Sequence, residues 1–431
     1  MRILISAGEA SGDMYGAELI EAIRARWGKI SAGTELGSAT AGQSPAQVVQ
    51  NPVPATRTLA STLEFFGAGG ERMRAAGCDI VVNARDLAVV GIMEVLSHLP
   101  KILGLYKKLI TAADERQPDL AVVIDSPAFN WRVARQMRRR GMPVVYYVCP
   151  QFWAWRQGRV KLLRQNVEKA LVIFPFEEKF YRDRGVDATF VGHPLANLPM
   201  PEISREQFAA QYGLNADRTW IALLPGSRRK EFRFNLPPII EAVKQLGIEF
   251  QFVLPVASTL DFQWAHRQVF HSRHSRRRRI DPFVALTREA LPSLRHARAA
   301  IVASGTATVE AALMETPFVM VYRVSPLTYA LGKPRIKVPH FAMVNLIAGE
   351  EIVPELVQRK FTAENVVAEL RKIIPAGPAR ETMVRGLKSV REKLSGPGGS
   401  TNGSAAHAAD RAAKIILEML TEGLPPFDPL T

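Results

Sequence analysis

Short apolar segments alternate with amphipathic segments along most of this chain, and this alternation constrains the fold more than any other feature. Residues 16–27 are one amphipathic example, since Leu19, Ile20, Ile23 and Trp27 share a helical face. Such alternation is typical of α/β proteins with a doubly wound parallel sheet. The expected strands are residues 2–7, 119–125, 143–150, 169–175 and 188–194 in the first half, and 219–227, 249–257, 299–305 and 317–324 in the second.

A proline-rich stretch, residues 192–202, separates the two halves. With 431 residues, the chain is too long for one ordinary core. We therefore expect one Rossmann-like domain over residues 1–195 and a second over 200–395. Ligands are expected to bind in a cleft between the two.

Two segments fit this alternation poorly. Residues 31–63 are rich in Ala, Ser, Thr, Pro and Gln, and we interpret them as a mobile insertion. Residues 395–407 form a glycine- and serine-rich linker before a last helix over 408–420. The tail, 396–431, is therefore expected to pack on an N-terminal domain.

The formal net charge of +15 predicts an anionic partner, such as nucleic acid, an acidic membrane face or a phosphorylated substrate. The basic residues gather in 131–140, 227–233 and 266–279, each of which is also explained by a solvated surface. Cys78 and Cys149 are too few and too far apart for a disulfide framework or a zinc site. Without a signal-peptide pattern or a long uncharged apolar stretch, a cytoplasmic location is expected.

The stretch LISAGEASGDMYG, residues 4–16, follows a strand and precedes a helix, which is the position of a phosphate-binding loop. Its glycines, Gly8, Gly12 and Gly16, are spaced GxxxGxxxG and not GxGxxG. The P-loop, HExxH and GxSxG signatures are also absent from the sequence. We therefore expect no nicotinamide or flavin cofactor and look for a nucleotide site elsewhere.

The segment LLPGSRRKE, residues 223–231, is a better nucleotide candidate. A buried strand is expected to end at Pro225 and Gly226, and the small residues Gly226 and Ser227 leave backbone N–H groups free before Arg228. The Arg228 guanidinium can neutralise a diphosphate. An ordinary turn with surface arginines explains this motif equally well.

A second strand end, ASGTATVEAAL over residues 303–313, supports the nucleotide interpretation. Ser304, Gly305 and Thr306 open a helix, whose N-terminus favours a phosphate. Glu310, on the first turns of that helix, can accept the hydroxyl groups of a ribose. Two such turns in one domain form a more specific pattern than either alone.

Asp125 is the corresponding strand-end residue of the first half, in VVIDSPAFN. Open α/β sheets place their ligands at the carboxyl ends of strands. A helix cap is the simpler explanation for a lone aspartate there. Opposite a donor-binding domain, however, Asp125 becomes a candidate general base for an attacking hydroxyl.

Taken together, the motifs resemble the lipid-A-disaccharide synthase family. The resemblance rests on blocks spread from residue 4 to about residue 358. In chain order, these blocks are AGEASGDMYGAELI, GAGGERMRAAGC, VVGIMEVLSHLPKI, IDSPAFN, YYVCPQFWAWR, FPFEEKFY, VGHPL, LLPGSRRKE, ASGTATVEAAL and NLIAGEEIVPELVQ.

The resemblance implies the two-domain GT-B fold and an inverting, metal-independent glycosyltransferase without a cofactor. Such an enzyme joins UDP-2,3-diacylglucosamine to 2,3-diacylglucosamine 1-phosphate, giving a β-1,6-linked disaccharide and UDP. Asp125 would be the base, Arg228 would bind the diphosphate, and Glu310 the ribose. Asn345 would contribute to the UDP pocket. The acceptor side would be lined by Glu9, Ser11 and Asp13.

Acylated substrates imply contact with an anionic inner-membrane surface. Residues 89–110 offer a broad apolar face beside lysines, although a buried helix pair would have the same pattern. The face comprises Ile92, Met93, Val95, Leu96, Leu99, Ile102, Leu103, Tyr106 and Leu109, with Lys101, Lys107 and Lys108 beside it. A homodimer is also compatible with the family.

Some positions depart from the family pattern. The 31–63 insertion replaces a short link, the 266–279 tract is unusually basic, and Asn197 stands where aspartate is common. These departures leave the purpose of the two segments open and weaken the case for a catalytic role at residue 197. His193 fits a hinge residue as well as a substrate contact.

Two other functions remain as alternatives. A UDP-N-acetylglucosamine 2-epimerase would share the nucleotide half but would need no apolar acyl surface. A nucleic-acid-binding protein would use the positive charge, yet the basic residues are scattered and no stacking platform accompanies them. We therefore expect no nucleic-acid partner.

Overall fold

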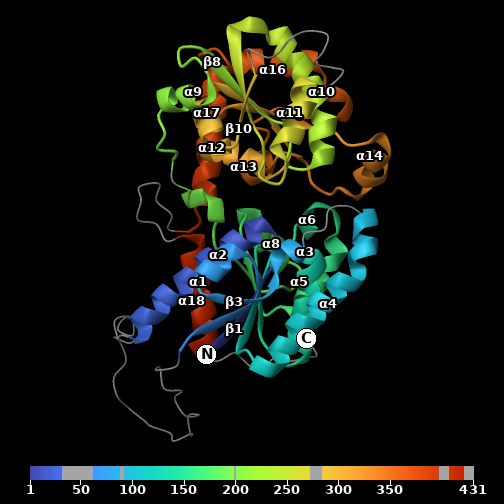
Figure 1. Ribbon diagram of the computed structural model, residues 1–431, viewed down its shortest axis with the longest axis vertical. Coiled ribbons are helices and arrows are strands. Elements are labelled where there is room, and N and C mark those ends of the chain that lie inside the picture. Colours follow the sequence, from blue (N-terminus) through green and yellow to red (C-terminus); the bar gives the residue numbers. More distant parts are fainter. Residues whose placement is uncertain (32–61, 88–91, 199, 272–283, 398–406, 422–431) are drawn as a thin grey trace, which may run out of the picture. The chain divides into compact units, whose positions relative to one another are not determined.

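The computed structural model describes residues 1–31, 62–87, 92–198, 200–271, 284–397 and 407–421. The chain divides into two compact units. The N-terminal unit comprises residues 1–152, 156–194 and 396–431, and the C-terminal unit comprises 153–155 and 195–395. Figure 1 shows a parallel sheet flanked by helices in each.

The N-terminal unit contains a seven-stranded parallel sheet in the order β3-β2-β1-β4-β5-β6-β7. Every residue of β4 is buried, as expected for a central strand with helices on both faces. The strands are β1 Arg2–Ala7, β2 Glu64–Gly69, β3 Cys78–Asn83, β4 Leu120–Ile124, β5 Val144–Tyr147, β6 Lys169–Val172 and β7 Ala188–Phe190. The helices of this unit are α1 Ala10–Ser31, α2 Glu71–Ala75, α3 Ala84–Leu87, α4 Ile92–Arg116, α5 Pro127–Arg139, α7 Val160–Asn166, α8 Pro175–Arg182 and α18 Ala408–Thr421. Helix α6, Phe152–Trp155, begins in this unit, and its residues 153–155 belong to the C-terminal unit.

The C-terminal unit contains a six-stranded parallel sheet in the order β10-β9-β8-β11-β12-β13. Its strands are β8 Thr219–Leu224, β9 Phe250–Pro255, β10 Val284–Thr287, β11 Ala299–Ala303, β12 Phe318–Tyr322 and β13 Glu355–Val357. Its helices are α9 Arg205–Tyr212, α10 Arg229–Leu246, α11 Phe262–Phe270, α12 Ala290–His296, α13 Thr306–Leu313, α14 Pro326–Gly332, α15 Met343–Ala348, α16 Ala363–Ile373 and α17 Pro378–Leu394.

Each sheet has one pair of neighbouring strands from which the later strands are added in opposite directions, so the winding direction of the sheet reverses there. In the N-terminal unit it lies between β1 and β4, which pair in parallel from Ile3 and Leu120 to Ala7 and Ile124. In the C-terminal unit it lies between β8 and β11. The loops that leave the two strands at such a point diverge, and open α/β sheets bind ligands there.

The strands predicted from the sequence are confirmed, and all of them except β1 end earlier than predicted. β2, β3, β10 and β13 were not predicted. β2 contains glycine, β13 is very short and β3 carries polar residues. None of these three strands is therefore a clear apolar run. The predicted insertion and the 395–407 linker lie almost wholly outside the described residues, as does most of the 266–279 tract.

Helix α1 begins at Ala10, so residues 10–13 are its first turn and not part of a loop. The predicted face is confirmed, because Leu19, Ile20, Ile23 and Trp27 are all buried. Gly12 and Gly16 allow the helix to approach the sheet closely. A Cβ at Gly12 would lie 3.2 Å from the Ala7 Cβ, and one at Gly16 would lie 2.7 Å from the Met73 Sδ. These two glycines therefore allow α1 to pack closely against its neighbours.

Helix α4 carries the apolar face that the sequence offered to a membrane. Leu109 is fully buried in the core, so this member of the predicted face is not available to a membrane, and Ile102 and Tyr106 are partly buried against the core. Leu103 is the exception, with 49% of its surface exposed. The side chains of residues 92–99 lie outside the described part. Within the described residues, no helix is both long and apolar enough to cross a bilayer.

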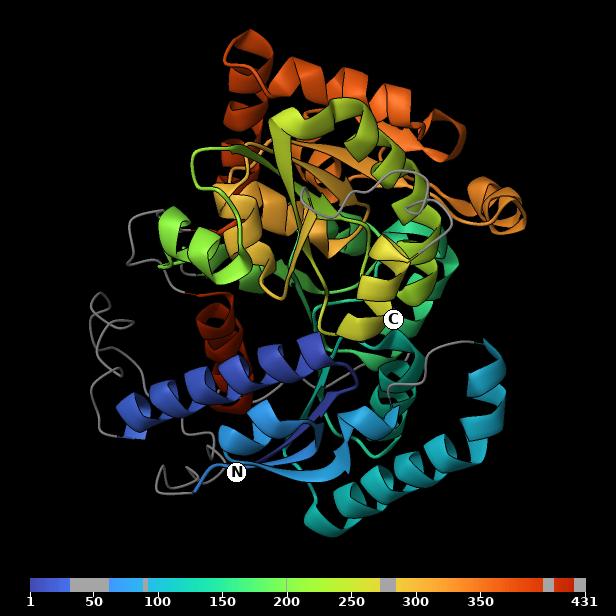
Figure 2. The ribbon, with the colours of Figure 1, turned by 45° about the horizontal axis from the view of Figure 1, so that its top comes forward.

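The last helix, α18, is confirmed and packs against α1 in the N-terminal unit. Figure 1 and Figure 2 show α18, in red, beside α1, in blue. The Arg26 guanidinium donates a hydrogen bond to the Asp410 carbonyl across this contact, at 3.1 Å. Ala412, Ala413 and Ile416 are fully buried on α18. The chain thus leaves the N-terminal unit and returns to complete it.

Candidate active site

Asp125 lies directly after β4, at the point where the first sheet changes winding direction. Its φ is 47° and that of Ser126 is 46°, so two successive non-glycine residues adopt the left-handed conformation. This conformation costs free energy, and it persists only where the surroundings hold it in place. The turn directs the chain abruptly from the strand into α5.

Asn130 holds this turn from the first helical turns of α5. Its Nδ2 donates to the carbonyls of Ser6, Ile124 and Asp125, at 3.0, 2.8 and 3.0 Å. Its Oδ1 accepts the Ser6 hydroxyl at 2.7 Å. The Tyr146 hydroxyl donates to the Asp125 carbonyl at 2.8 Å. Asn130 and Tyr146 are fully buried, and the sequence alone did not indicate their role.

The environment of Asp125 favours the protonated carboxyl. Burial, followed by the negative charge of Glu9, raises the pKa of Asp125 from 3.8 to about 6, while a backbone hydrogen bond from Ser126 acts in the opposite direction. Near neutral pH the carboxylate is therefore ionised and is a stronger base than an ordinary aspartate. This is the property that a general base requires.

The opening loop lies against the Asp125 turn. A Cβ at Gly8 would overlap the Ser126 hydroxyl, so this position requires glycine. Glu9 is exposed, and Ser11 is partly exposed on the first turn of α1. The structure thus brings the predicted acceptor-side residues Glu9 and Ser11 to the same sheet edge as Asp125.

Asp13 is placed differently from the other predicted acceptor-side residues. It is buried, and its carboxylate accepts hydrogen bonds from the backbone N–H groups of Gly70, Arg72 and Met73, at 2.7, 3.1 and 3.1 Å. These groups belong to the N-terminus of α2, where a carboxylate is favourable. Asp13 is therefore a structural brace for the β2–α2 turn.

The predicted diphosphate residues follow β8, at the winding reversal of the second sheet. Gly226 has a φ of 124°, and a Cβ there would lie 2.7 Å from the Glu231 Cβ. The Ser227 carbonyl accepts the Thr259 hydroxyl at 2.6 Å. The Arg228 side chain is 71% exposed and forms an ion pair with Glu231 at 2.9 Å. An exposed ion pair contributes little, so the guanidinium can exchange Glu231 for an anionic ligand.

Buried Asn235 links this loop to Arg323, the residue that follows strand β12. Its Nδ2 donates to the Pro225 carbonyl at 2.9 Å, and its Oδ1 accepts the Arg323 N–H at 3.0 Å. Asn235 thus has the same function in the second unit as Asn130 in the first. It was also missed from the sequence, because an asparagine within a helix has no distinctive pattern.

The turn after β11 contains the other predicted phosphate residues. Gly305 has a φ of 139°, and a Cβ there would meet no atom within 4 Å. Gly305 and Thr306 are exposed, and Thr306 begins α13. The first N–H groups of a helix have no partners within it. The structure therefore leaves open space beside a helix N-terminus.

Glu310 lies further along α13 and is partly buried. Burial raises the pKa of Glu310 above its ordinary value. Among the residues that the structure describes, none donates a hydrogen bond to its carboxylate. A half-buried acceptor without a partner is suited to hydroxyl donors from a ligand.

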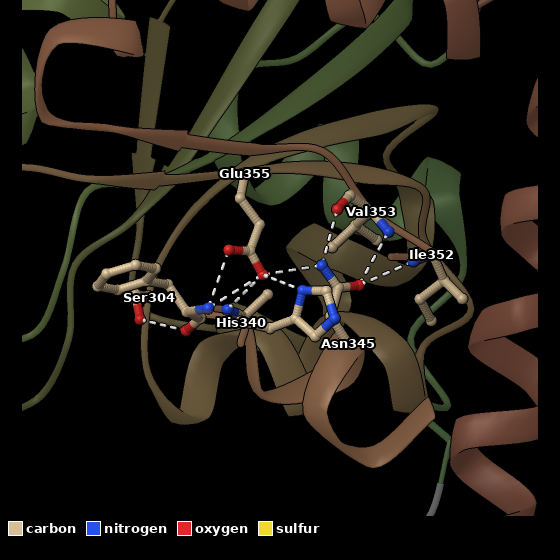
Figure 3. Close-up of polar contacts among 8 residues, drawn as sticks. Ser304, His340, Asn345, Ile352, Val353 and Glu355 are labelled. Carbon is tan, nitrogen blue, oxygen red and sulfur yellow. Dashed lines mark hydrogen bonds and ion pairs between the residues drawn. The ribbon is translucent and has the colours of Figure 1, made fainter. Parts of the chain in front are cut away.

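Asn345, predicted to line the UDP pocket, is instead fully engaged within the protein (Figure 3). Its Nδ2 donates to the Val353 carbonyl and to Glu355, each at 2.9 Å. Its Oδ1 accepts the N–H groups of Ile352 and Val353, at 2.9 and 3.0 Å. All four hydrogen bonds of the amide are thereby used.

Glu355 connects this network to the turn after β11. It accepts the N–H groups of Phe341 and Ala342, and the Phe341 carbonyl accepts the Ser304 hydroxyl at 2.9 Å (Figure 3). Asn345 and Glu355 therefore fix the position of Ser304. The sequence placed Asn345 correctly in the C-terminal unit but did not reveal this bracing role.

A family model described as lipid-A-disaccharide synthetase matches residues 3–405. The chain belongs to the lipid-A-disaccharide synthase family. The synthase of Koribacter versatilis is 49% identical over 97% of this chain and 98% of the relative. That of Acidobacterium capsulatum is 47% identical over 97% of this chain and 96% of the relative.

Solved structures confirm the GT-B fold expected for a lipid-A-disaccharide synthase family member. The UDP-GlcNAc 2-epimerase of Neisseria meningitidis, bound to UDP-GlcNAc, has a TM-score of 0.57 at 11% identity, covering 98% of this chain and 100% of that one. The glycotransferase of kitacinnamycin also has a TM-score of 0.57, at 15% identity, covering 97% of this chain and 98% of that one.

Membership of the lipid-A-disaccharide synthase family establishes a glycosyltransferase of lipid A biosynthesis that acts on UDP-sugar and lipid substrates. The epimerase alternative is supported only by a likeness of fold. Among the described residues, no group of three or more His, Cys, Asp or Glu side chains is arranged to hold a metal ion.

Proposed function

We propose that this protein transfers 2,3-diacylglucosamine from its UDP form to the 6-hydroxyl of 2,3-diacylglucosamine 1-phosphate, with inversion. The bond between C1 and the acceptor oxygen forms as the bond between C1 and the UDP oxygen breaks. The products are the β-1,6-linked disaccharide 1-phosphate and UDP. The observation that carries the proposal is the Asp125 carboxylate, held after β4 with its pKa raised to about 6.

In this mechanism Asp125 accepts the proton of the attacking hydroxyl late in the displacement. An alcohol is a poor nucleophile, so it needs a base as its bond to C1 forms. The braced turn keeps the carboxylate in one position, which lowers the entropic barrier to the reaction. Glu9 and Ser11 lie on the acceptor side, where they can bind sugar hydroxyls.

The C-terminal unit binds the donor in this proposal. Arg228 and the backbone N–H groups of Gly226 and Ser227 stabilise the negative charge that develops on UDP. Ser304, Gly305 and Thr306 offer a helix N-terminus to the phosphates. Glu310 accepts the ribose hydroxyls. Asn345 and Asp13 are positioning residues and touch no substrate.

Acylated substrates also lead us to propose that the protein acts on the cytoplasmic face of the inner membrane, as a peripheral protein attracted to anionic lipid. The formal charge of +15 supports this location. Binding of vesicles containing phosphatidylglycerol, weakened by salt, would support the proposal. Equal binding to neutral vesicles would contradict its electrostatic part. A homodimer is compatible with this function, and sedimentation velocity measures it directly.

The test of the reaction is UDP release by the purified protein with and without 2,3-diacylglucosamine 1-phosphate, dispersed in detergent. We expect turnover only with the acceptor, and full activity in EDTA. UDP release that does not depend on the acceptor would overturn the proposal.

Two variants separate the proposed roles. Asp125→Asn should reduce transfer by at least about a hundredfold and leave UDP affinity unchanged, because the base acts after binding. Arg228→Ala should weaken UDP binding about tenfold or more, because it removes a charged donor. Arg229→Ala, the adjacent arginine, is the matched control and should affect neither. An Asp125→Asn variant with most of the wild-type rate would show that another group is the base.

A further inference from the structure

Helix α14, Pro326–Gly332, exposes large apolar side chains at the surface of the C-terminal unit. Leu327 is 70% exposed and Leu331 is 57% exposed. They are four residues apart and so lie on the same face of the helix. Figure 1 and Figure 2 both show α14, in orange, projecting from the body of its unit, and it packs mainly on the 3-10 turn Lys333–Arg335 that follows it.

The charged side chains of α14 and of the segment that follows it, up to Lys337, are all basic. Lys333, Arg335 and Lys337 follow the helix and are exposed. From Pro326 to Gly349 the sequence contains no aspartate or glutamate. Two exposed leucines beside three exposed cations form a segment that is apolar and basic at once, and such segments bind the interface of anionic bilayers.

A different surface of the same unit provides a comparison. Ile248 is 64% exposed, but it stands alone and is followed by Glu249. Single exposed apolar residues are common and need no partner. The paired leucines of α14 differ because they combine apolar area with positive charge, and one signal alone gives only weak membrane binding.

We propose that residues 326–337 are a membrane contact of the C-terminal unit, in which Leu327 and Leu331 enter the interface of an anionic bilayer and the three basic side chains bind its headgroups. This inference rests on the proposed peripheral membrane association and assigns to it a specific site, separate from α4.

The test is sedimentation of the full-length protein with vesicles of phosphatidylethanolamine and phosphatidylglycerol, and with vesicles of phosphatidylcholine alone. Leu327→Ser combined with Leu331→Ser should reduce partitioning onto the anionic vesicles by about tenfold or more. Lys333→Gln, Arg335→Gln and Lys337→Gln together should reduce it by at least about tenfold, and the loss should shrink at high salt.

Control variants carry the same kinds of substitution elsewhere on the unit. Ile248→Ser, and Arg371→Gln combined with Lys388→Gln, should leave partitioning within about twofold of wild type. All the variants should retain wild-type UDP release on detergent-dispersed acceptor, which shows that they are folded.

The outcomes separate the two proposals. If the wild-type protein binds no vesicles, the membrane association itself fails and this site fails with it. If the wild type binds and both α14 variants bind equally well, only the site is overturned. If the leucine variant instead changes the oligomeric state in sedimentation velocity while binding vesicles normally, the face contacts a second copy and the membrane assignment is wrong.

Discussion

Asp125 combines two features that destabilise a folded protein: left-handed backbone in a residue other than glycine, and a carboxylate with much of its hydration removed. Both have the same origin, since the turn that strains the backbone also buries the side chain beside Glu9. The raised pKa that results is favourable for a general base. The group is ionised near neutral pH and still binds a proton more strongly than an exposed aspartate.

The first prediction concerns pH. A base must be deprotonated, so kcat/KM should rise with pH through about 6, the pKa of Asp125, and then level off. The negative charge of Glu9 raises that pKa, so Glu9→Gln should move the rise to lower pH. Steady-state rates between pH 4.5 and 8.5, roughly the range over which such a group titrates, measure this shift.

Glu21→Gln is the control for the pH prediction, because Glu21 is exposed on α1 and does not influence Asp125. Its pH profile should match that of wild type. A Glu9→Gln profile that also matches wild type would show that Asp125 is not the group that limits the rate at low pH.

The sequence alone could predict which residues stand at strand ends, but not which way their side chains point. Asp125, Arg228 and Glu310 follow apolar runs or open helices, and these patterns are local. Asp13 and Asn345 lie in helices α1 and α15, and their side chains are hydrogen-bonded to backbone groups at residues 70–73 and 352–353. Such pairings arise only from the tertiary fold.

At the level of elements, the β4–α5 turn depends on Asn130. Asn130→Ala would leave the Ser6 hydroxyl and three carbonyls with fewer partners, and should lower the free energy of unfolding by about 3 kcal/mol. A loosened turn would also admit water to Asp125 and lower its pKa. Chemical denaturation and the pH profile measure the two effects.

Asn166→Ala is the matched control for this prediction, because the Asn166 amide donates to the Leu162 carbonyl of its own helix and, among the described residues, to no other group. It should cost less than about 1 kcal/mol and leave the pH profile unchanged. If Asn130→Ala loses stability but keeps the wild-type pH profile, the residue supports the fold without positioning the base.

The contact between the opening loop and the Asp125 turn gives a second prediction at this level. Gly8→Ala should lower the free energy of unfolding by about 1–3 kcal/mol, because the new methyl group overlaps the Ser126 hydroxyl. Adding Ser126→Gly should restore much of the loss. Gly28→Ala, within α1 and with no atom nearby, should instead stabilise the protein by up to about 1 kcal/mol. Equal effects at Gly8 and Gly28 would contradict a packing role for Gly8.

Strands and helices could be predicted from the sequence where the residues of the element alone were enough to identify it. Central strands such as β4 and β11 are fully buried and therefore form continuous apolar runs. β13 has only three residues and β2 contains two glycines, so their identity depends on the neighbours with which they pair. The apolar face of α4 could not be assigned from its period, because a helix that covers a sheet and one that meets a membrane look alike.

At the scale of the whole molecule, the N-terminal unit is built from segments that are not contiguous in the sequence. Residues 396–431 follow the entire C-terminal unit, yet α18 completes the N-terminal one. Each unit has its own sheet and its own buried core, so each is expected to unfold as a separate cooperative transition. The stability of the N-terminal unit should then depend on the last residues of the chain.

Calorimetry on two core variants tests this dependence. Ile416 is fully buried on α18, and Leu387 is fully buried on α17 of the C-terminal unit. Each substitution by alanine should remove about 2–5 kcal/mol from one transition only, with Ile416→Ala acting on the N-terminal unit and Leu387→Ala on the C-terminal one. Added UDP should raise the midpoint temperature of the transition that Leu387→Ala lowers and leave that of the other transition unchanged. The reason is that a ligand stabilises only the unit that binds it. A single transition that both variants lower equally would instead mean that the two units unfold together, and that α18 stabilises the whole chain through one cooperative structure.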